Sequence, residues 1–232
     1  MKPIYKTILV VIIFSIAMAA LESSVVVYLR AIYYSDGFTV AFKLIDQKIL
    51  MVELLRELAT LVMIWAVAYL TGKNRYERLA YFLLCFAVWD IFYYVWLKVF
   101  IDWPSSIFEW DILFLIPFTW LGPVLSPVIC SVTMIVLAVV ILRTSDVKIS
   151  NLSMAMLAMG SLLILYTYLF DYGVILWQND LVSDYANLLR NEKFITVASA
   201  YVPVSYNWGV FWVGELVIGI GIVRIWFMNR IS

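Results

Sequence analysis

Residues 79–99 read LAYFLLCFAVWDIFYYVWLKV. The stretch is apolar or aromatic except for Asp90 and Lys98. It is as long as the roughly 20 residues that a helix needs to cross the hydrocarbon core of a bilayer. Its length and composition therefore predict a transmembrane helix with an acidic side chain near the middle. Both features recur along the chain.

The composition of the whole chain points the same way. Of its 232 residues, 65% are hydrophobic and only 14% are charged, and the mean hydropathy is +0.98. Soluble domains carry about 25% charged residues, so this chain has too few to cover a surface that faces water. We therefore predict an all-α, polytopic helical membrane protein in which residues 1–232 form a single transmembrane bundle.

Six stretches are long and apolar enough to be predicted as spans. They cover residues 7–29, 50–70, 79–99, 123–142, 151–170 and 207–227. Lys2 and Lys6, followed by an apolar run and Ala17-Met18-Ala19, imitate a cleaved signal peptide. Because the apolar pattern continues to Leu29, we expect this first helix to be retained.

The distribution of positive charge predicts the orientation. An even number of spans places both termini on one side, and the side that is rich in Lys and Arg is normally cytoplasmic. The positive residues expected on the side of the termini are Lys2, Lys6, Lys73, Arg75, Arg78, Arg143, Lys148, Arg224 and Arg230. The acids expected there are Glu77 and Asp146. We therefore predict a multi-pass protein of a cell membrane, the bacterial inner membrane, with cytoplasmic termini.

The connections predicted on the outer face are the longer ones, and they are the expected docking surface. In the second of them we predict a short interfacial helix over Asp111–Trp120, and a re-entrant segment that lines a cavity is the alternative. In the third, apolar residues at helical spacing predict an amphipathic helix. The candidate docking residues are Trp120, Leu181, Tyr185 and Leu188.

Charged residues inside the predicted spans are the strongest functional signal. At about 1.5 Å per residue, five of them from four spans lie within roughly 6 Å of the midplane, all on its outer side. Asp90, Tyr94 and Lys98 are spaced i, i+4, i+8, which predicts one stripe on a helix face. The candidate proton- or cation-binding residues are Glu22, Arg56, Glu57, Asp90, Tyr94, Lys98 and Glu215.

The acids in this layer outnumber its one deep cation, Arg56. In a low dielectric they cannot all be ionised without a further positive charge. Either some carboxyl groups are protonated, or a monovalent or hard divalent cation such as Na⁺, Ca²⁺ or Mg²⁺ binds there. The alternative is that the charged groups fix helix packing through pairs and hydrogen bonds. Which metal ion, if any, would bind is left open.

The residue types that are missing exclude several chemistries. The chain has no histidine, which excludes His-ligated haem, copper and zinc and histidine-based catalytic triads. We therefore predict no cofactor. The net charge is zero and no aqueous basic run is present, so nucleic acid is not an expected partner.

Three functions remain after these exclusions. The first is a non-catalytic accessory or structural subunit of a larger integral membrane complex. The second is a small proton- or cation-linked transporter or channel that uses the buried carboxylates. The third is a membrane-embedded lipid-modifying enzyme. The expected partners are the lipid bilayer and either other membrane subunits or further copies of this chain.

Overall fold

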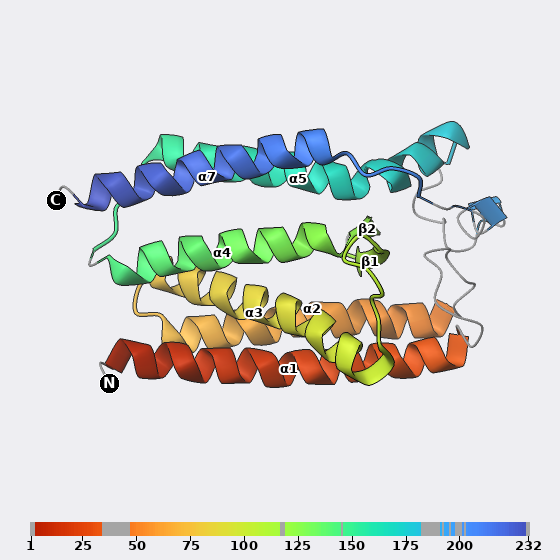
Figure 1. The fold of residues 1–232 in the computed structure, drawn as a ribbon, viewed down its shortest axis with the longest axis horizontal. Helices are drawn as coiled ribbons and strands as arrows, with labels where there is room; N and C mark the ends of the chain where they lie inside the picture. The colour runs from red at the N-terminus through yellow and green to blue at the C-terminus, as the bar shows by residue number, and fades with distance from the viewer. Residues whose placement is uncertain are drawn as a thin grey trace.

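The computed structural model describes residues 3–33, 47–116, 119–144, 146–181, 191, 193–194, 196–197, 201 and 203–230. These residues form an elongated, mostly helical bundle with both chain termini at one end (Figure 1). The helices are α1 (Pro3–Tyr33), α2 (Gln47–Thr71), α3 (Arg75–Ile101), α4 (Leu125–Arg143), α5 (Asn151–Gln178) and α7 (Trp208–Arg230). The predicted helical class is confirmed.

Five of these helices are long and apolar enough to cross a membrane, namely α1, α3, α4, α5 and α7. They coincide with five of the six predicted spans, and α1 and α5 extend several residues beyond the predicted ends. α2 carries Glu53, Arg56 and Glu57 in its first half and is not among the five. The sixth span therefore stays a prediction.

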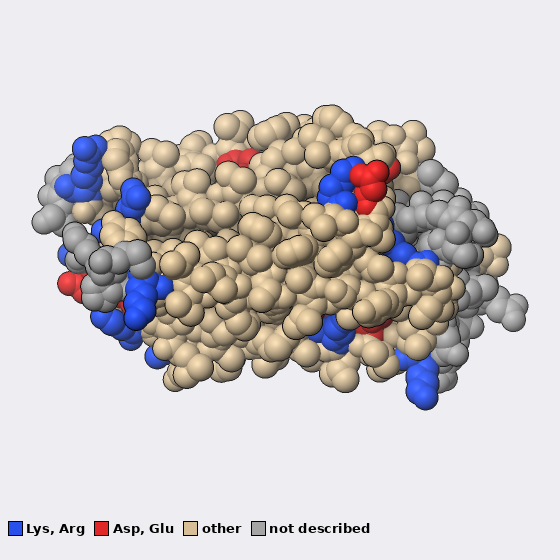
Figure 2. Space-filling view, turned by 60° about the horizontal axis from the view of Figure 1, so that its bottom comes forward, with Lys and Arg blue, Asp and Glu red and all other residues tan. Residues whose placement is uncertain are grey.

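The surface of the bundle fits this interpretation. Charged side chains gather toward the two ends of the molecule, and the flank between them is largely uncharged (Figure 2). Large apolar side chains of the helices, such as Leu21 of α1 and Leu216 of α7, are more than half exposed. A bilayer is a suitable solvent for such a flank.

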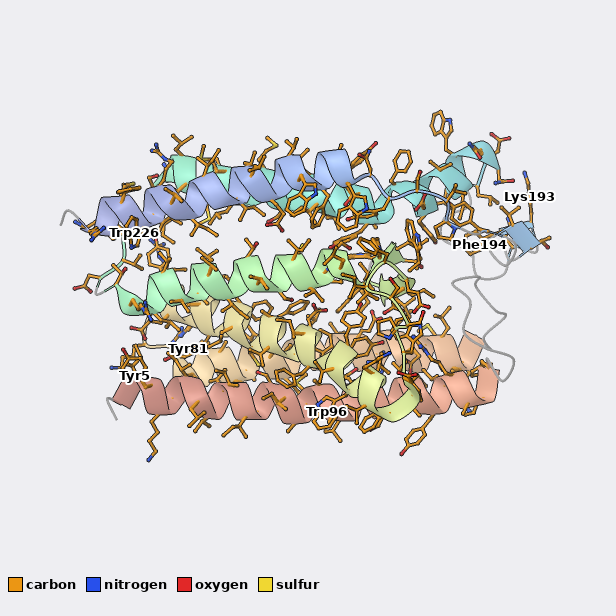
Figure 3. All side chains as sticks on the ribbon, viewed as in Figure 1. Tyr5, Tyr81, Trp96, Lys193, Phe194 and Trp226 are labelled. Atoms are coloured by element: carbon orange, nitrogen blue, oxygen red, sulfur yellow. The ribbon has the colours of Figure 1, made fainter. Side chains whose placement is uncertain are left out.

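The helices fall into two closely packed groups. In one group α3 lies against α1, α2 and α4, and in the other α5 lies against α7. The Trp96 indole of α3 donates a hydrogen bond to the Ile16 carbonyl of α1 at 3.1 Å (Figure 3). The backbones of α5 and α7 approach so closely that a Cβ added to Gly160 would lie 2.6 Å from the Gly214 carbonyl oxygen.

The segment between α3 and α4 corrects one prediction. Instead of a helix over Asp111–Trp120, it forms an antiparallel hairpin of β1 (Trp110–Phe114) and β2 (Trp120–Pro123), in which Asp111 pairs with Gly122. The physical reason lies in the sequence. Pro117 lacks the N–H that a helix needs and restricts the residue before it, whereas the aromatic residues on either side suit a strand.

The predicted amphipathic helix falls mostly outside the described residues. Up to residue 190 only Leu181 is described; it lies after α5 and outside any helix, and it is buried with Tyr172 and Phe194 at the end of the bundle opposite the termini. The remaining residues of this prediction, Tyr185 and Leu188 among them, lie outside the described residues. Phe194 marks this end of the molecule and Trp226 the end that holds the termini (Figure 3).

Candidate functional site

A cavity of about 390 Å³ lies between the two helix groups. α3 and α4 form one wall, α5 and α7 form the other, and the β1–β2 hairpin lines it as well. The α5–α7 pair contacts the other helix group mainly where α7 lies against α4 and α5 lies against β2. We call this space the acidic cavity, because two carboxyl groups, Asp90 and Glu215, line it.

Glu215 enters the acidic cavity from α7. The side chain is 9% exposed, and its Oε2 accepts a hydrogen bond from the Thr133 hydroxyl of α4 at 2.7 Å. The carboxyl group also lies beside the Cys130 thiol, a weak donor. Its other oxygen, Oε1, is buried and receives no hydrogen bond of normal geometry from any described residue. A buried acceptor without a donor is costly, so this oxygen marks a place for a ligand or a proton.

Asp90 enters the same cavity from α3. Its Oδ2 accepts a hydrogen bond from the Ser131 hydroxyl of α4 at 2.8 Å. Ser131 and Thr133 thus orient two carboxyl groups that belong to different helices. Both acids lie nearer the hairpin end of their helices than the end with the termini (Figure 1), as the depth calculation predicts.

The rest of the cavity wall contains no Lys or Arg among its described lining residues. It is mostly apolar and aromatic, and Trp120 of β2 stacks on Tyr168 of α5 with ring centroids 5.9 Å apart. The Trp120 indole N–H is also buried and has no hydrogen-bond acceptor among the described residues. The described wall therefore offers neither carboxyl group a basic partner, and each is bonded by one hydroxyl group of α4.

The acids of α1 and α2 have a different environment. Arg56 of α2 forms ion pairs with Glu22 of α1 and with Glu53, the latter at 2.9 Å between Nε and Oε2. Thr60 donates a further hydrogen bond to Glu22. We call these four residues the Arg56 cluster. In this cluster two carboxyl groups share one guanidinium, whereas the described wall of the acidic cavity supplies no basic side chain.

Glu57, predicted in the same layer, contacts the hairpin instead. Both of its carboxyl oxygens accept hydrogen bonds from the Leu115 backbone N–H, at 3.1 and 3.0 Å. The side chain is buried. Glu57 therefore attaches the end of β1 to α2 and is a positioning residue in this arrangement.

The predicted Asp90, Tyr94 and Lys98 stripe is divided among three environments. The Tyr94 hydroxyl donates to Asp111 Oδ2 at 3.2 Å. Lys98 pairs with Asp102 at 2.7 Å near the end of α3, where both side chains are exposed. The hydrogen bond from Lys98, and then its charge, lower the pKa of Asp102. Spacing along one helix could not show which neighbours each side chain would meet.

Sequence reasoning missed Asp111 and Arg30 as members of a buried group. Arg30 Nη2 lies 3.7 Å from Asp111 Oδ1, and its guanidinium lies 3.8 Å from the centre of the Trp103 ring. Burial raises the pKa of Asp111 to about 6, and the nearby Arg30 charge and the Tyr94 hydrogen bond oppose this rise. The available signal was an acid inside the apolar run Trp110–Leu115.

No set of three Asp, Glu, Cys or His side chains among the described residues is grouped closely enough to hold a metal ion. Comparisons with models of protein families, with curated proteins and with solved structures give no match. The function is therefore argued from the geometry of the acidic cavity.

Proposed function

We propose that the protein is a small proton- or cation-linked membrane transporter. The observation that carries this proposal is that Asp90 and Glu215, from two different helices, line one cavity whose described wall has no basic side chain. Intramembrane carboxyl groups that face a shared cavity are typical of substrate and proton pathways. Cys130 and Tyr168 are the other titratable groups that face this site, and both are neutral at pH 7 unless strongly perturbed.

The packing supports a simple way to open the cavity. The α5–α7 pair is held together by the close contact of Gly160 with Gly214, and the cavity separates α5 from α3 and α4. A small rocking of this pair against α4 would change access to the two acids without breaking either group. Relative motion of two rigid helix groups around a fixed site is the common design of secondary transporters.

The topology belongs to the same proposal. We propose that α2 is a sixth span and that both termini are cytoplasmic. The positions of the termini at one end of the bundle and of exposed basic residues such as Lys73, Arg143 and Lys148 support this orientation. Reporter fusions at the N-terminus, in the connection at residues 72–74 and at the C-terminus test it, and we expect all three on the cytoplasmic side. An N-terminal reporter on the opposite side from the one at residues 72–74 would contradict α2 as a span, and three reporters on the outer side would contradict the orientation.

Flux across proteoliposomes tests the transport proposal. We expect an imposed pH gradient to drive a measurable proton or cation flux through the wild type, and Asp90→Asn and Glu215→Gln each to reduce it at least tenfold. Asp146→Asn is the control, because Asp146 is exposed and lies in the connection between α4 and α5. Equal flux through all four proteins, or none through any, would contradict the proposal.

A subunit role is the second candidate. Trp177 at the end of α5 is 78% exposed and Val204 is 94% exposed, both on the side of the molecule where outer connections are predicted. Exposed apolar side chains beyond a bilayer favour contact with another protein. Extraction in mild detergent, with native mass and identification of co-purifying chains, tests this function. Stoichiometric companions would support a subunit, and a single chain alone would contradict it.

A further inference from the structure

The wall of the acidic cavity indicates the class of molecule that it binds. We propose that its ligand is a hydrophobic organic amine, bound as a cation with its ammonium group at Glu215. This inference rests on the transport function proposed above and names the substrate class of the same site.

The apolar wall argues against a metal ion as the ligand. Hard cations such as Na⁺, Mg²⁺ and Ca²⁺ prefer about six or more oxygen ligands. Here the charged oxygen ligands come only from Asp90 on α3 and Glu215 on α7, and the hydroxyl groups of Ser131 and Thr133 already donate to them. Ser161 lies apart from these on α5. Leu, Ile and Phe side chains occupy most of the remaining surface. Such a wall favours a ligand that is mainly apolar.

The size and aromatic content of the cavity suit an amine with a ring or a short chain. A volume of about 390 Å³ is within the ordinary range of roughly 300 to 1,000 Å³ for small-molecule sites. Phe86, Phe114 and Trp120 form a continuous aromatic series along the wall, with neighbouring ring centroids 6.5 and 5.7 Å apart. Aromatic faces attract both apolar groups and cations.

The position of the positive charge follows from Glu215. Its Oε1 is the buried acceptor that lacks a normal donor, and an ammonium group has three N–H donors and no acceptor. Thr133 holds the other oxygen, so the carboxylate is already oriented before a ligand arrives. One ammonium neutralises one of the two carboxylates. Asp90 then remains available to carry the proton of the transport cycle.

Binding of a matched pair of probes tests this assignment. The probe is 4-phenylbutylamine, and the control compound is 4-phenyl-1-butanol, which has the same apolar body and no charge. In detergent at pH 7.5, in a buffer free of other amines, we expect the amine to raise the unfolding temperature in a saturable way. We expect the alcohol to give a much weaker, non-saturable change.

The variants locate the binding site. Glu215→Gln should weaken amine binding at least tenfold, and Thr133→Val should weaken it less, because the carboxylate stays but loses its orienting hydroxyl. Asp146→Asn should bind as the wild type does. If Glu215→Gln unfolds, the more conservative Glu215→Asp should fold and show weaker binding, because it keeps the charge and shortens the reach.

Two results would contradict the assignment of an amine as the ligand and leave the proposed transport function intact. One is equal stabilisation by the amine and the alcohol, together with flux that still depends on Asp90 and Glu215. The other is a saturable shift from NaCl or MgCl₂ that is lost in Glu215→Gln while the amine has no effect. If neither the flux nor the unfolding temperature depends on pH, on metal salt or on the amine, the transport function is contradicted as well.

Discussion

On the α1–α2 side of the bundle, Glu22 and Glu53 contact the guanidinium of Arg56. On the α3–α7 side, Asp90 and Glu215 accept hydrogen bonds from hydroxyl groups and line a cavity without a basic side chain. The residue types and the depths are similar on the two sides. Their partners differ, because the first two acids share a guanidinium and the second two have no basic side chain among the described lining residues.

The largest expected effect comes from removing the cation of the Arg56 cluster. Arg56→Met should lower the free energy of unfolding by roughly 3 to 5 kcal/mol, because two buried carboxylates lose their counter-charge. Denaturant titration in detergent measures this change. Arg143→Met, at the exposed end of α4, is the matched control and should change stability little. Similar values for the two variants would show that the cluster does not neutralise its acids as described.

The pH dependence of Asp111 provides the next effect. Burial raises its pKa from about 3.8 to about 6, so the folded state holds the proton more tightly than the unfolded state. The stability from this proton is fully present below about pH 4 and is lost as the pH rises through about 6, a change of about 2 to 3 kcal/mol. Unfolding curves of the wild type and Asp111→Asn from pH 4 to 7 measure it. Parallel curves would contradict it.

A smaller effect on stability is expected at the contact between α5 and α7, the two helices that form the second wall of the acidic cavity. Gly160→Val should lower the free energy of unfolding by about 2 kcal/mol, because its Cβ would meet the Gly214 carbonyl and the Ile218 side chain. Gly219→Val is the control, since a Cβ at Gly219 meets nothing within 4 Å. Unfolding temperatures in one detergent compare the two. Equal losses would mean that close α5–α7 contact is not what the variant disturbs.

The smallest expected effect is the loss of one hydroxyl on the cavity side. Thr133→Val should lower the free energy of unfolding by about 1 kcal/mol, because Glu215 Oε2 loses its donor. Thr133→Ser keeps the hydroxyl and should recover most of this loss. Urea or mild heat denaturation resolves differences of this size. A Val variant as stable as the wild type would show that this hydrogen bond does not stabilise the folded state.

Helices whose existence depends on composition were predicted from the sequence. Contacts that depend on how each helix is rotated about its own axis were not. Five helices follow from the length of their apolar runs, since a bilayer demands about 20 such residues. The contact of Arg56 with Glu22 joins residues 34 positions apart, and no local pattern reports which face of α1 turns toward α2.

The hairpin was missed for a related reason. Its apolar residues read equally well as a short helix, and only Pro117 argued locally against one. The strands are stabilised by tertiary contacts, because Glu57 accepts a hydrogen bond from the Leu115 N–H and Gly122 packs on the Tyr168 ring. Sequence reasoning that treats each segment alone has no access to such contacts.

The attachment of the hairpin to Glu57 also constrains the order of biogenesis. The backbone N–H at the end of β1 donates to Glu57 of α2, and α2 leaves the ribosome before the hairpin does. β2 packs on α5, which leaves the ribosome after the hairpin. The hairpin therefore gains its partners only after the fifth helix has been synthesised. We expect nascent chains that stop before residue 151 to remain sensitive to protease at residues 110–123, and full-length chains to be protected. Equal protection of both would place hairpin formation before the arrival of α5.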